Sequence, residues 1–310
     1  MEIITMKGHD DLEQNFESLI AGKAYAEIDL PVPVINPALW ESVTKPLCML
    51  LTGLSEDDIE QVARYAKYLM DDRALSDAEA AQLADEAQDA PMPDGNNMGG
   101  AAIAKCLERL TNLVILKNTK EYRDRERALM KRLEKLKEDL AEIRKVEDSS
   151  DNDGLPDVED AGSCQPSDVQ QTKAAELVKE ISAVRSDLKG VRRMLDALMY
   201  AESGTKGLVI SKISVFPHNV RSILHRERDH TPYAVLDDLA ILYSHVLSRC
   251  ERVRMVEAMG APEIILRNER RMLGEAVSNV YANGKDTAPV CGADGQPLSC
   301  LRDILCRAIM

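Results

Sequence analysis

Apolar residues recur at alternating steps of four and three in four segments of this chain, and this spacing constrains the fold more than any other feature. The segments are residues 129–143, 177–198, 239–253 and 266–280. Such spacing places apolar side chains along one face of an α-helix, the pattern of a coiled-coil seam. Consecutive helices with such seams bury them by folding back on each other. The sequence therefore predicts two helical hairpins and a mainly α fold class, with coiled-coil hairpins and short β segments.

The second hairpin, residues 235–283, has clear ends as well as clear seams. Gly260 and Pro262 interrupt the pattern, because proline fixes φ and has no amide hydrogen to donate. Asn283 and Gly284 mark the end of the second arm, since both tolerate the left-handed backbone conformation. The seam of the first arm consists of Leu239, Tyr243, Val246, Cys250 and Val253. The second arm contributes Leu266, Leu273, Val277 and Val280.

The first hairpin, residues 105–204, is longer and carries an acidic insert. Its apolar positions are Leu129, Leu133, Leu136, Leu140 and Ile143 in one arm and Leu177, Ile181, Val184, Leu188, Val191, Leu195 and Leu198 in the other. Between the arms, residues 147–168 contain eight acidic side chains and no Lys or Arg. Such a segment cannot bury a core, so we expect a disordered linker.

The N-terminal segment, residues 1–104, combines an extended part with short helices. Three prolines in residues 31–37 exclude a helix and predict an extended segment at the edge of a sheet. Ser55, followed three residues later by Asp58, predicts a helix N-cap. Residues 71–89 are rich in alanine and acidic side chains, which predicts a solvated helix or a mobile excursion.

The amino-acid composition of the chain excludes several classes of fold and function. With two Phe, one Trp and eight Tyr, the chain has the residue types of helices rather than of a β-rich core. The net charge of −14 argues against a free-standing nucleic-acid binder, because phosphate contacts need positive potential. Seven scattered Cys residues without a Cys-x-x-Cys pair predict reduced, mostly buried thiols and no zinc site. No run of eighteen apolar residues indicates a membrane span.

The sequence shows no recognisable catalytic constellation. The five His residues are dispersed, and none lies at a recognisable spacing from a Ser or Cys nucleophile. Residues 150–155 superficially resemble a magnesium-binding aspartate loop, but Leu155 stands where a third carboxylate is needed. Calcium-loop spacing in the same acidic tract is more often solvated charge. We therefore expect no catalytic residue, and no metal or cofactor held by this chain.

The turn of the second hairpin resembles a known protein family. From Gly260 the chain reads Gly-Ala-Pro-Glu-Ile-Ile-Leu-Arg-Asn-Glu-Arg-Arg-Met. This run closely resembles the clamp-helix coiled coil in the largest subunit, beta prime, of bacterial-type multisubunit RNA polymerases. The family usually has Val, Lys and Gln where Leu266, Arg270 and Gly274 stand. Further segments similar to the family follow in family order, at residues 27–30, 46–60, 98–103, 213–221, 237–243 and 295–303.

The resemblance covers about residues 25–310 and implies a clamp portion without the catalytic centre. The chain starts where the family's zinc ribbon ends and stops before the aspartate loop that holds catalytic magnesium. The resemblance thus implies a piece of a split polymerase, as in large bacteriophages, with magnesium on a partner subunit. The implied partners include the remaining part of beta prime and the beta parts. The implied location is the bacterial cytoplasm, in an infected host cell if the chain is phage-encoded, with the virion as an alternative.

The resemblance also implies an initiation-factor docking face near the turn of the second hairpin. The matching positions are Arg249, Arg252, Arg267, Glu269, Arg271 and Ala276. Arginine suits such a face because its planar fork binds carboxylates through two hydrogen bonds and stacks on aromatic rings. The alternative is that these charges merely pair along and between the two helices.

Two further segments resemble loops that lie in the family beside the template DNA and the RNA:DNA hybrid. The lid region, residues 205–234, contains Arg226 and Arg228, and the rudder region, residues 284–310, contains Lys285. The family rudder is rich in arginine, whereas here Lys285 is followed by Asp286 and Asp294. The lid arginines are therefore the stronger candidates for phosphate contact.

Two other classes of function stay open at this point. A non-enzymatic coiled-coil scaffold or adaptor explains both hairpins and the acidic charge, but leaves the ordered family-like segments as coincidence. A stand-alone DNA-binding protein is the third class, and the net charge of −14 disfavours it.

Overall fold

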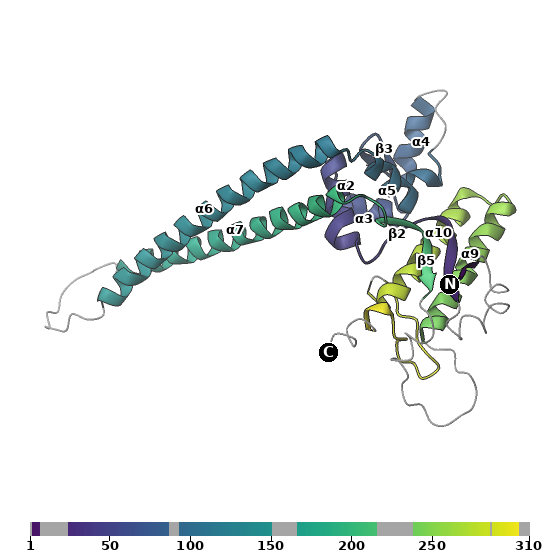
Figure 1. The fold of residues 1–310 in the computed structure, drawn as a ribbon. Coiled ribbons are helices and arrows are strands. Elements are labelled where there is room, and N and C mark those ends of the chain that lie inside the picture. Colours follow the sequence, from purple (N-terminus) through teal and green to yellow (C-terminus); the bar gives the residue numbers. More distant parts are fainter. Residues whose placement is uncertain are drawn as a thin grey trace. The chain divides into compact units, whose positions relative to one another are not determined.

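The computed structural model describes residues 2–6, 24–86, 93–150, 166–215, 238–285 and 287–303. It is mainly helical with a few short strands, which confirms the predicted fold class (Figure 1). The chain divides into two compact units. The first unit comprises Met1–Leu110 with Gly204–Met310, and the second comprises Thr111–Ser203. The finer predicted boundaries within the first unit stay predictions.

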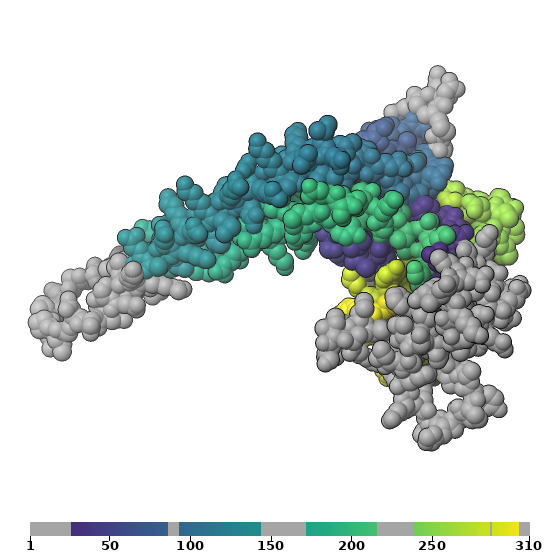
Figure 2. All heavy atoms as spheres, in the orientation of Figure 1, coloured from purple at the N-terminus to yellow at the C-terminus, as the bar shows by residue number. Residues whose placement is uncertain are grey.

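The second unit is a long antiparallel helical hairpin. Helix α6 spans Asn112–Ser150 and α7 spans Pro166–Glu202, and the two lie side by side (Figures 1 and 2). The predicted seam is buried at Leu136, Ile181 and Val184, with Leu133 packed against them. Between the arms, Arg192 Nε pairs with Glu126 Oε1 at 2.8 Å. Both helices extend into the predicted acidic linker, whose residues 151–165 lie outside the described part of the chain.

A three-stranded sheet lies in the first unit. Its strands are β1 (Glu2–Met6), β2 (Ala24–Ile35) and β5 (Val209–Val215), in the order β1-β2-β5. Strand β2 pairs in parallel with β1 and antiparallel with β5. The proline-rich segment is extended as predicted. It belongs to β2, the central strand, but lies beyond Ala24–Ile28, the part of β2 that pairs with β1. The sheet tolerates Pro31 and Pro33 because they lie between Asp29 and Val34, where the register with β5 shifts.

Short elements fill the remainder of the N-terminal part. They are the π-helix η1 (Trp40–Thr44), α2 (Lys45–Thr52), α3 (Glu56–Ala63), β3 (Tyr68–Met70), β4 (Arg73–Leu75), α4 (Asp77–Glu86), the 3-10 helix η2 (Gly95–Asn97) and α5 (Gly99–Glu108). The β3–β4 hairpin was not expected from the sequence. Its turn residues Asp71 and Asp72 have φ values of 44° and 59°, and aspartate is one of the few residues that tolerate this region.

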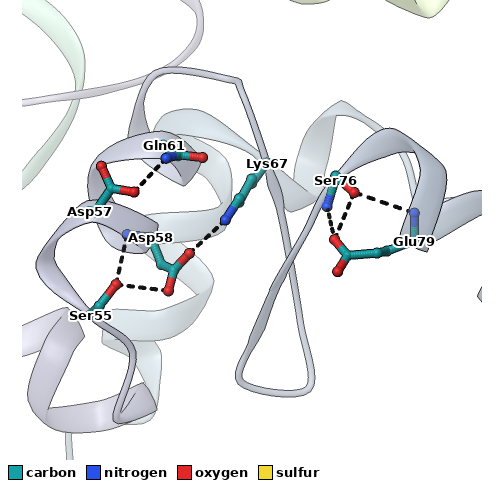
Figure 3. Close-up of polar contacts among 7 residues, drawn as sticks. All are labelled: Ser55, Asp57, Asp58, Gln61, Lys67, Ser76 and Glu79. Atoms are coloured by element: carbon teal, nitrogen blue, oxygen red, sulfur yellow. Dashed lines mark hydrogen bonds and ion pairs between the residues drawn. The ribbon is translucent and has the colours of Figure 1, made fainter.

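Two side-chain caps fix the starts of α3 and α4 (Figure 3). Ser55 Oγ accepts a hydrogen bond from the Asp58 amide at 3.1 Å, which confirms the predicted N-cap. Lys67 and Ser55 lower the pKa of Asp58, because both donate hydrogen bonds to its carboxylate. At α4, Glu79 Oε2 accepts from both the amide and the hydroxyl of Ser76, at 2.8 and 2.7 Å. In return, Ser76 Oγ accepts a hydrogen bond from the Glu79 amide at 3.4 Å, and this reciprocal arrangement is a capping box.

The second hairpin consists of α9 (Asp238–Ala258) and α10 (Glu263–Ala282). All nine predicted seam residues are buried, and they join Ala26, Ile28 and Ile213 of the sheet in one apolar core. Gly260 between the arms has φ of 63° and Gly284 after the second arm has φ of 80°. Both predicted breaks are thus confirmed, since glycine adopts this backbone region without strain.

Candidate functional site

The six predicted docking residues lie on two different flanks of the α9–α10 hairpin. Glu269 and Ala276 are seven residues apart on α10 and share one flank, whereas Arg267 and Arg271 are four apart and share another. Residues 267 and 269 are separated by about 200° around the helix axis. Arg249 and Arg252 of α9 adjoin the flank of Glu269. The structure therefore brings together four of the six residues.

Glu269 is the centre of the first flank. It is only 8% exposed, although its charge favours water. Arg249 Nη1 lies 3.6 Å from its Oε2 atom, and Arg252 Nε lies 3.4 Å from its Oε1 atom. Oε2 accepts no hydrogen bond from any residue that the structure describes. The two arginines thus neutralise a buried carboxylate across the hairpin, which is the pairing that the alternative interpretation expected.

Exposed apolar residues continue this flank toward the turn. Ile265 precedes Glu269 by one helical turn and is 44% exposed. Met259, in the turn immediately after α9, lies seven residues beyond Arg252 and is 65% exposed. Ala276 is half-buried one heptad beyond Glu269. We call Arg249, Arg252, Met259, Ile265, Glu269 and Ala276 the docking flank. It combines two arginines with large apolar side chains, a composition common in protein interfaces.

Arg267 is committed to a different contact. Its Nη1 and Nη2 atoms donate to the two carboxylate oxygens of Asp77, at 2.7 and 3.1 Å. These hydrogen bonds lower the pKa of Asp77 and raise the pKa of Arg267. Because Asp77 is the first residue of α4, Arg267 links α4 to α10 through a two-pronged ion pair.

Arg271 lies beside a small cavity. Its Nη2 atom donates to Asn268 Oδ1 at 2.9 Å, and it also pairs with Glu275. The cavity has a volume of about 140 Å³ and is lined by Arg271, Gly274, Trp40 and Tyr65 among others. A Cβ atom at Gly274 would contact none of the residues that the structure describes. A small side chain would therefore have room at this position beside the cavity.

Arg270 was not expected to matter, yet its side chain is one of the most buried charges of the hairpin, 11% exposed. Its guanidinium pairs with Glu257 at 3.4 Å and with Glu263 at 3.5 Å. A Cβ atom at Gly95 would lie 1.8 Å from Arg270 Nη1, so a larger residue there would force this guanidinium to move. The sequence signal was the substitution of Arg for the family's Lys at this position. The contact with Gly95 could not be predicted from the sequence, because the two residues lie far apart in the chain.

The residues predicted to lie beside nucleic acid are only partly described. Arg226, Arg228 and Asp286 lie outside the described residues. Lys285 is exposed three residues after the end of α10. The loop behind it is held by Asn283, whose Nδ2 donates to the carbonyls of Val290 and Leu298 at 2.8 and 2.9 Å. Sequence reasoning treated Asn283 only as a helix end and missed this role.

Within the described ranges, no group of three or more His, Cys, Asp and Glu side chains is placed to hold a metal ion. None of the described helices is both long enough and apolar enough to cross a membrane. The expectation that this chain holds no cofactor stays a prediction.

The sequence of this chain is similar to sequences of one kind of protein. No family model matches the chain. The chain is 25% identical over 296 residues to DNA-directed RNA polymerase subunit beta' of Chlamydia pneumoniae, covering 93% of this chain and 17% of that protein. It is 33% identical over 139 residues to the subunit beta' of Bifidobacterium longum, covering 44% of this chain and 10% of that protein. The Micrococcus luteus subunit beta' is 33% identical over 113 residues, covering 36% of this chain and 8% of that protein. The chain thus spans less than a fifth of the length of these relatives, and its similarity relates it to the beta prime subunit of DNA-directed RNA polymerase.

Proposed function

We propose that this chain forms the clamp portion of a multisubunit DNA-directed RNA polymerase whose beta prime subunit is split, as in large bacteriophages. The observation that carries this function is the similarity to beta prime subunits over 93% of the chain. The family-like run from Gly260 to Met272 lies at the turn of a well-packed helical hairpin, which supports the clamp role. The clamp closes over template DNA while partner subunits carry out nucleotidyl transfer. Magnesium is held by one of these partners.

The docking flank is the surface that receives a promoter-recognition factor. The side chains of Arg249 and Arg252 are 37% and 50% exposed, although both pair with Glu269. A guanidinium has five N–H donors, so one carboxylate leaves donors for a partner. Met259 and Ile265 supply exposed apolar area beside them. A factor segment that carries both carboxylates and apolar side chains matches this flank.

Arg267 and Arg271 lie on another flank of α10, so we leave them out of the proposed surface. Arg267 already joins α10 to α4 through Asp77, and Arg271 faces the cavity beside Trp40. Moving either side chain to an incoming factor would break a contact within the unit. We assign Arg267 to holding α4 in place.

Contacts to nucleic acid are assigned to the lid and rudder regions, with Arg226, Arg228 and Lys285 beside the RNA:DNA hybrid. The net charge of −14 requires that partner subunits supply most of the positive channel. The complex works in the bacterial cytoplasm, in an infected host cell if the chain is phage-encoded, or is carried in a virion.

The docking role is tested with Met259→Asp in the assembled polymerase. This residue is 65% exposed, so the substitution leaves the seam and the ion pairs intact. We expect factor affinity to fall about tenfold to a hundredfold, since a charge replaces an apolar contact at the interface. Initiation at promoters falls in parallel, whereas elongation from a preformed scaffold is unchanged.

Arg193→Glu provides a matched control, because Arg193 is an exposed arginine on α7 of the other unit. It should leave factor affinity and both activities unchanged. Equal loss of initiation and elongation in Met259→Asp contradicts the docking role. Recovery of the native chain alone, without larger subunits, favours a scaffold or adaptor instead. Steeply salt-dependent DNA binding by the isolated chain favours a stand-alone DNA-binding protein.

A further inference from the structure

Two cysteines from distant parts of the sequence meet inside the first unit. Cys48 lies on α2 and Cys106 lies on α5, and these two helices pack against each other. Cys48 is 0% exposed and Cys106 is 3% exposed. The two thiols lie close enough together for each to shift the pKa of the other. Sequence reasoning treated both only as small buried apolar residues.

Cys106 also borders a cavity of about 310 Å³. Asp71, Asp72, Lys105 and Arg109 are among the other residues that line it. Asp71 and Lys105 are exposed, so the cavity reaches the surface. A water molecule takes up about 30 Å³, so a small polar molecule such as hydrogen peroxide has room beside Cys106. Cys48 is not part of the cavity wall.

The surroundings of the two thiols make them chemically unequal. The hydrogen bond from Cys48 and the positive charge of Arg109 lower the pKa of Cys106, against the opposing effects of burial and of Asp72. The hydrogen bond with Cys106 and burial raise the pKa of Cys48. Arg109 is held in place by Asp72, with Nη2 and Oδ2 3.0 Å apart. Thiolates, not thiols, react with peroxides, so Cys106 is the nucleophile of the pair.

We propose that Cys106 and Cys48 form a peroxide-sensitive dithiol that closes to a disulfide between α5 and α2. The Cys106 thiolate attacks one oxygen of hydrogen peroxide, the O–O bond breaks, and hydroxide leaves. This step oxidises Cys106 to a sulfenic acid and reduces the peroxide. The Cys48 sulfur then attacks the sulfenic sulfur, and the S–S bond forms. The sulfenic oxygen leaves as water with the proton from Cys48. A small thiol reductant reverses the reaction.

The test treats the folded full-length chain with hydrogen peroxide and maps its thiols by peptide mass spectrometry without reduction. We expect a peptide pair joined through Cys48 and Cys106, lighter by two hydrogen atoms and released by dithiothreitol. Cys291 is the internal control, because it is exposed in a loop and has no thiol partner among the described residues. Its oxidation should be slower than that of Cys106.

Two variants separate the steps. Cys48→Ser should stop the reaction at a sulfenic acid on Cys106, which dimedone captures. Cys106→Ser should leave Cys48 reduced. Circular dichroism verifies that both variants are folded. Oxidation of Cys291 while Cys106 stays a thiol would overturn the proposal, as would accumulation of Cys106 sulfenic acid in the unaltered chain without linkage to Cys48. Both outcomes can be observed in the unaltered chain, even if a variant does not fold.

Discussion

The close approach of α5 to β2 depends on Gly100, and replacing this residue offers a quantitative test of the packing. A Cβ atom at Gly100 would lie 2.2 Å from the Pro33 carbonyl oxygen and 3.0 Å from the Val34 Cα atom. Real Cβ atoms essentially never approach another heavy atom within 3.0 Å, so the Gly100→Ala variant must separate the two backbones by about 0.8 Å. Backbone cannot rotate away as a flexible side chain can. We therefore expect a loss of about 2–3 kcal/mol in the free energy of unfolding.

Gly274→Ala is the matched control in the same unit. Gly274 lies within α10, and a Cβ atom there would meet none of the described residues. Because alanine has the higher helix propensity, this variant should gain about 0.5–1 kcal/mol. Urea unfolding can be followed through Trp40, the single tryptophan of the chain, which is 9% exposed in this unit. Equal stability of the two variants, at unchanged urea dependence, would refute the close approach of α5 to β2.

Three more predictions concern contacts of the first unit. Arg267 holds the pKa of Asp77 below its usual 3.8, so the folded state binds this proton less tightly than the unfolded state. The resulting stability is present above about pH 4 and is lost as the pH falls through the folded-state pKa. In urea titrations, the Asp77→Asn variant should therefore lose less stability on acidification than the unaltered chain. Because Asp77 is 61% exposed, the effect should stay below about 1 kcal/mol, and an unchanged acid loss would contradict the pairing. Lys45→Met should lower the free energy of unfolding, measured in urea, by about 1–2 kcal/mol, because it removes a 7% exposed ammonium that three carboxylates share. Lys212 is exposed, so Lys212→Met should lower it by less than about 1 kcal/mol. Leu273→Ala should cost about 2–5 kcal/mol by leaving a cavity at the hairpin seam, and a smaller loss would show that the seam is loosely packed.

Local patterns explain what could be predicted from the sequence. The seam residues of both hairpins follow from helical periodicity, which needs no knowledge of distant residues. The Ser55 cap follows from a spacing of three residues. Gly260 and Gly284 follow from the backbone freedom of glycine. Each of these features is encoded by residues that lie close together in the sequence.

Long-range contacts explain what could not be predicted. Arg267 pairs with Asp77 on another helix, and the guanidinium of Arg270 occupies space that Gly95 leaves free because it has no side chain. The central position of β2 depends on pairing with β1 and β5, which periodicity does not specify. The six predicted docking residues lie on two flanks, because matching them to the family by sequence position did not show which side of its helix each side chain occupies.

The subunit composition of the native complex tests the central claim most directly. We would purify the chain from its natural source through an affinity tag and measure the intact mass of the complex and of each component. We expect the chain to be held in a large assembly with the remaining part of beta prime and the beta parts, able to extend RNA on a DNA template. A chain recovered alone or as a simple oligomer, with no nucleotidyl-transferring partner, would contradict the account.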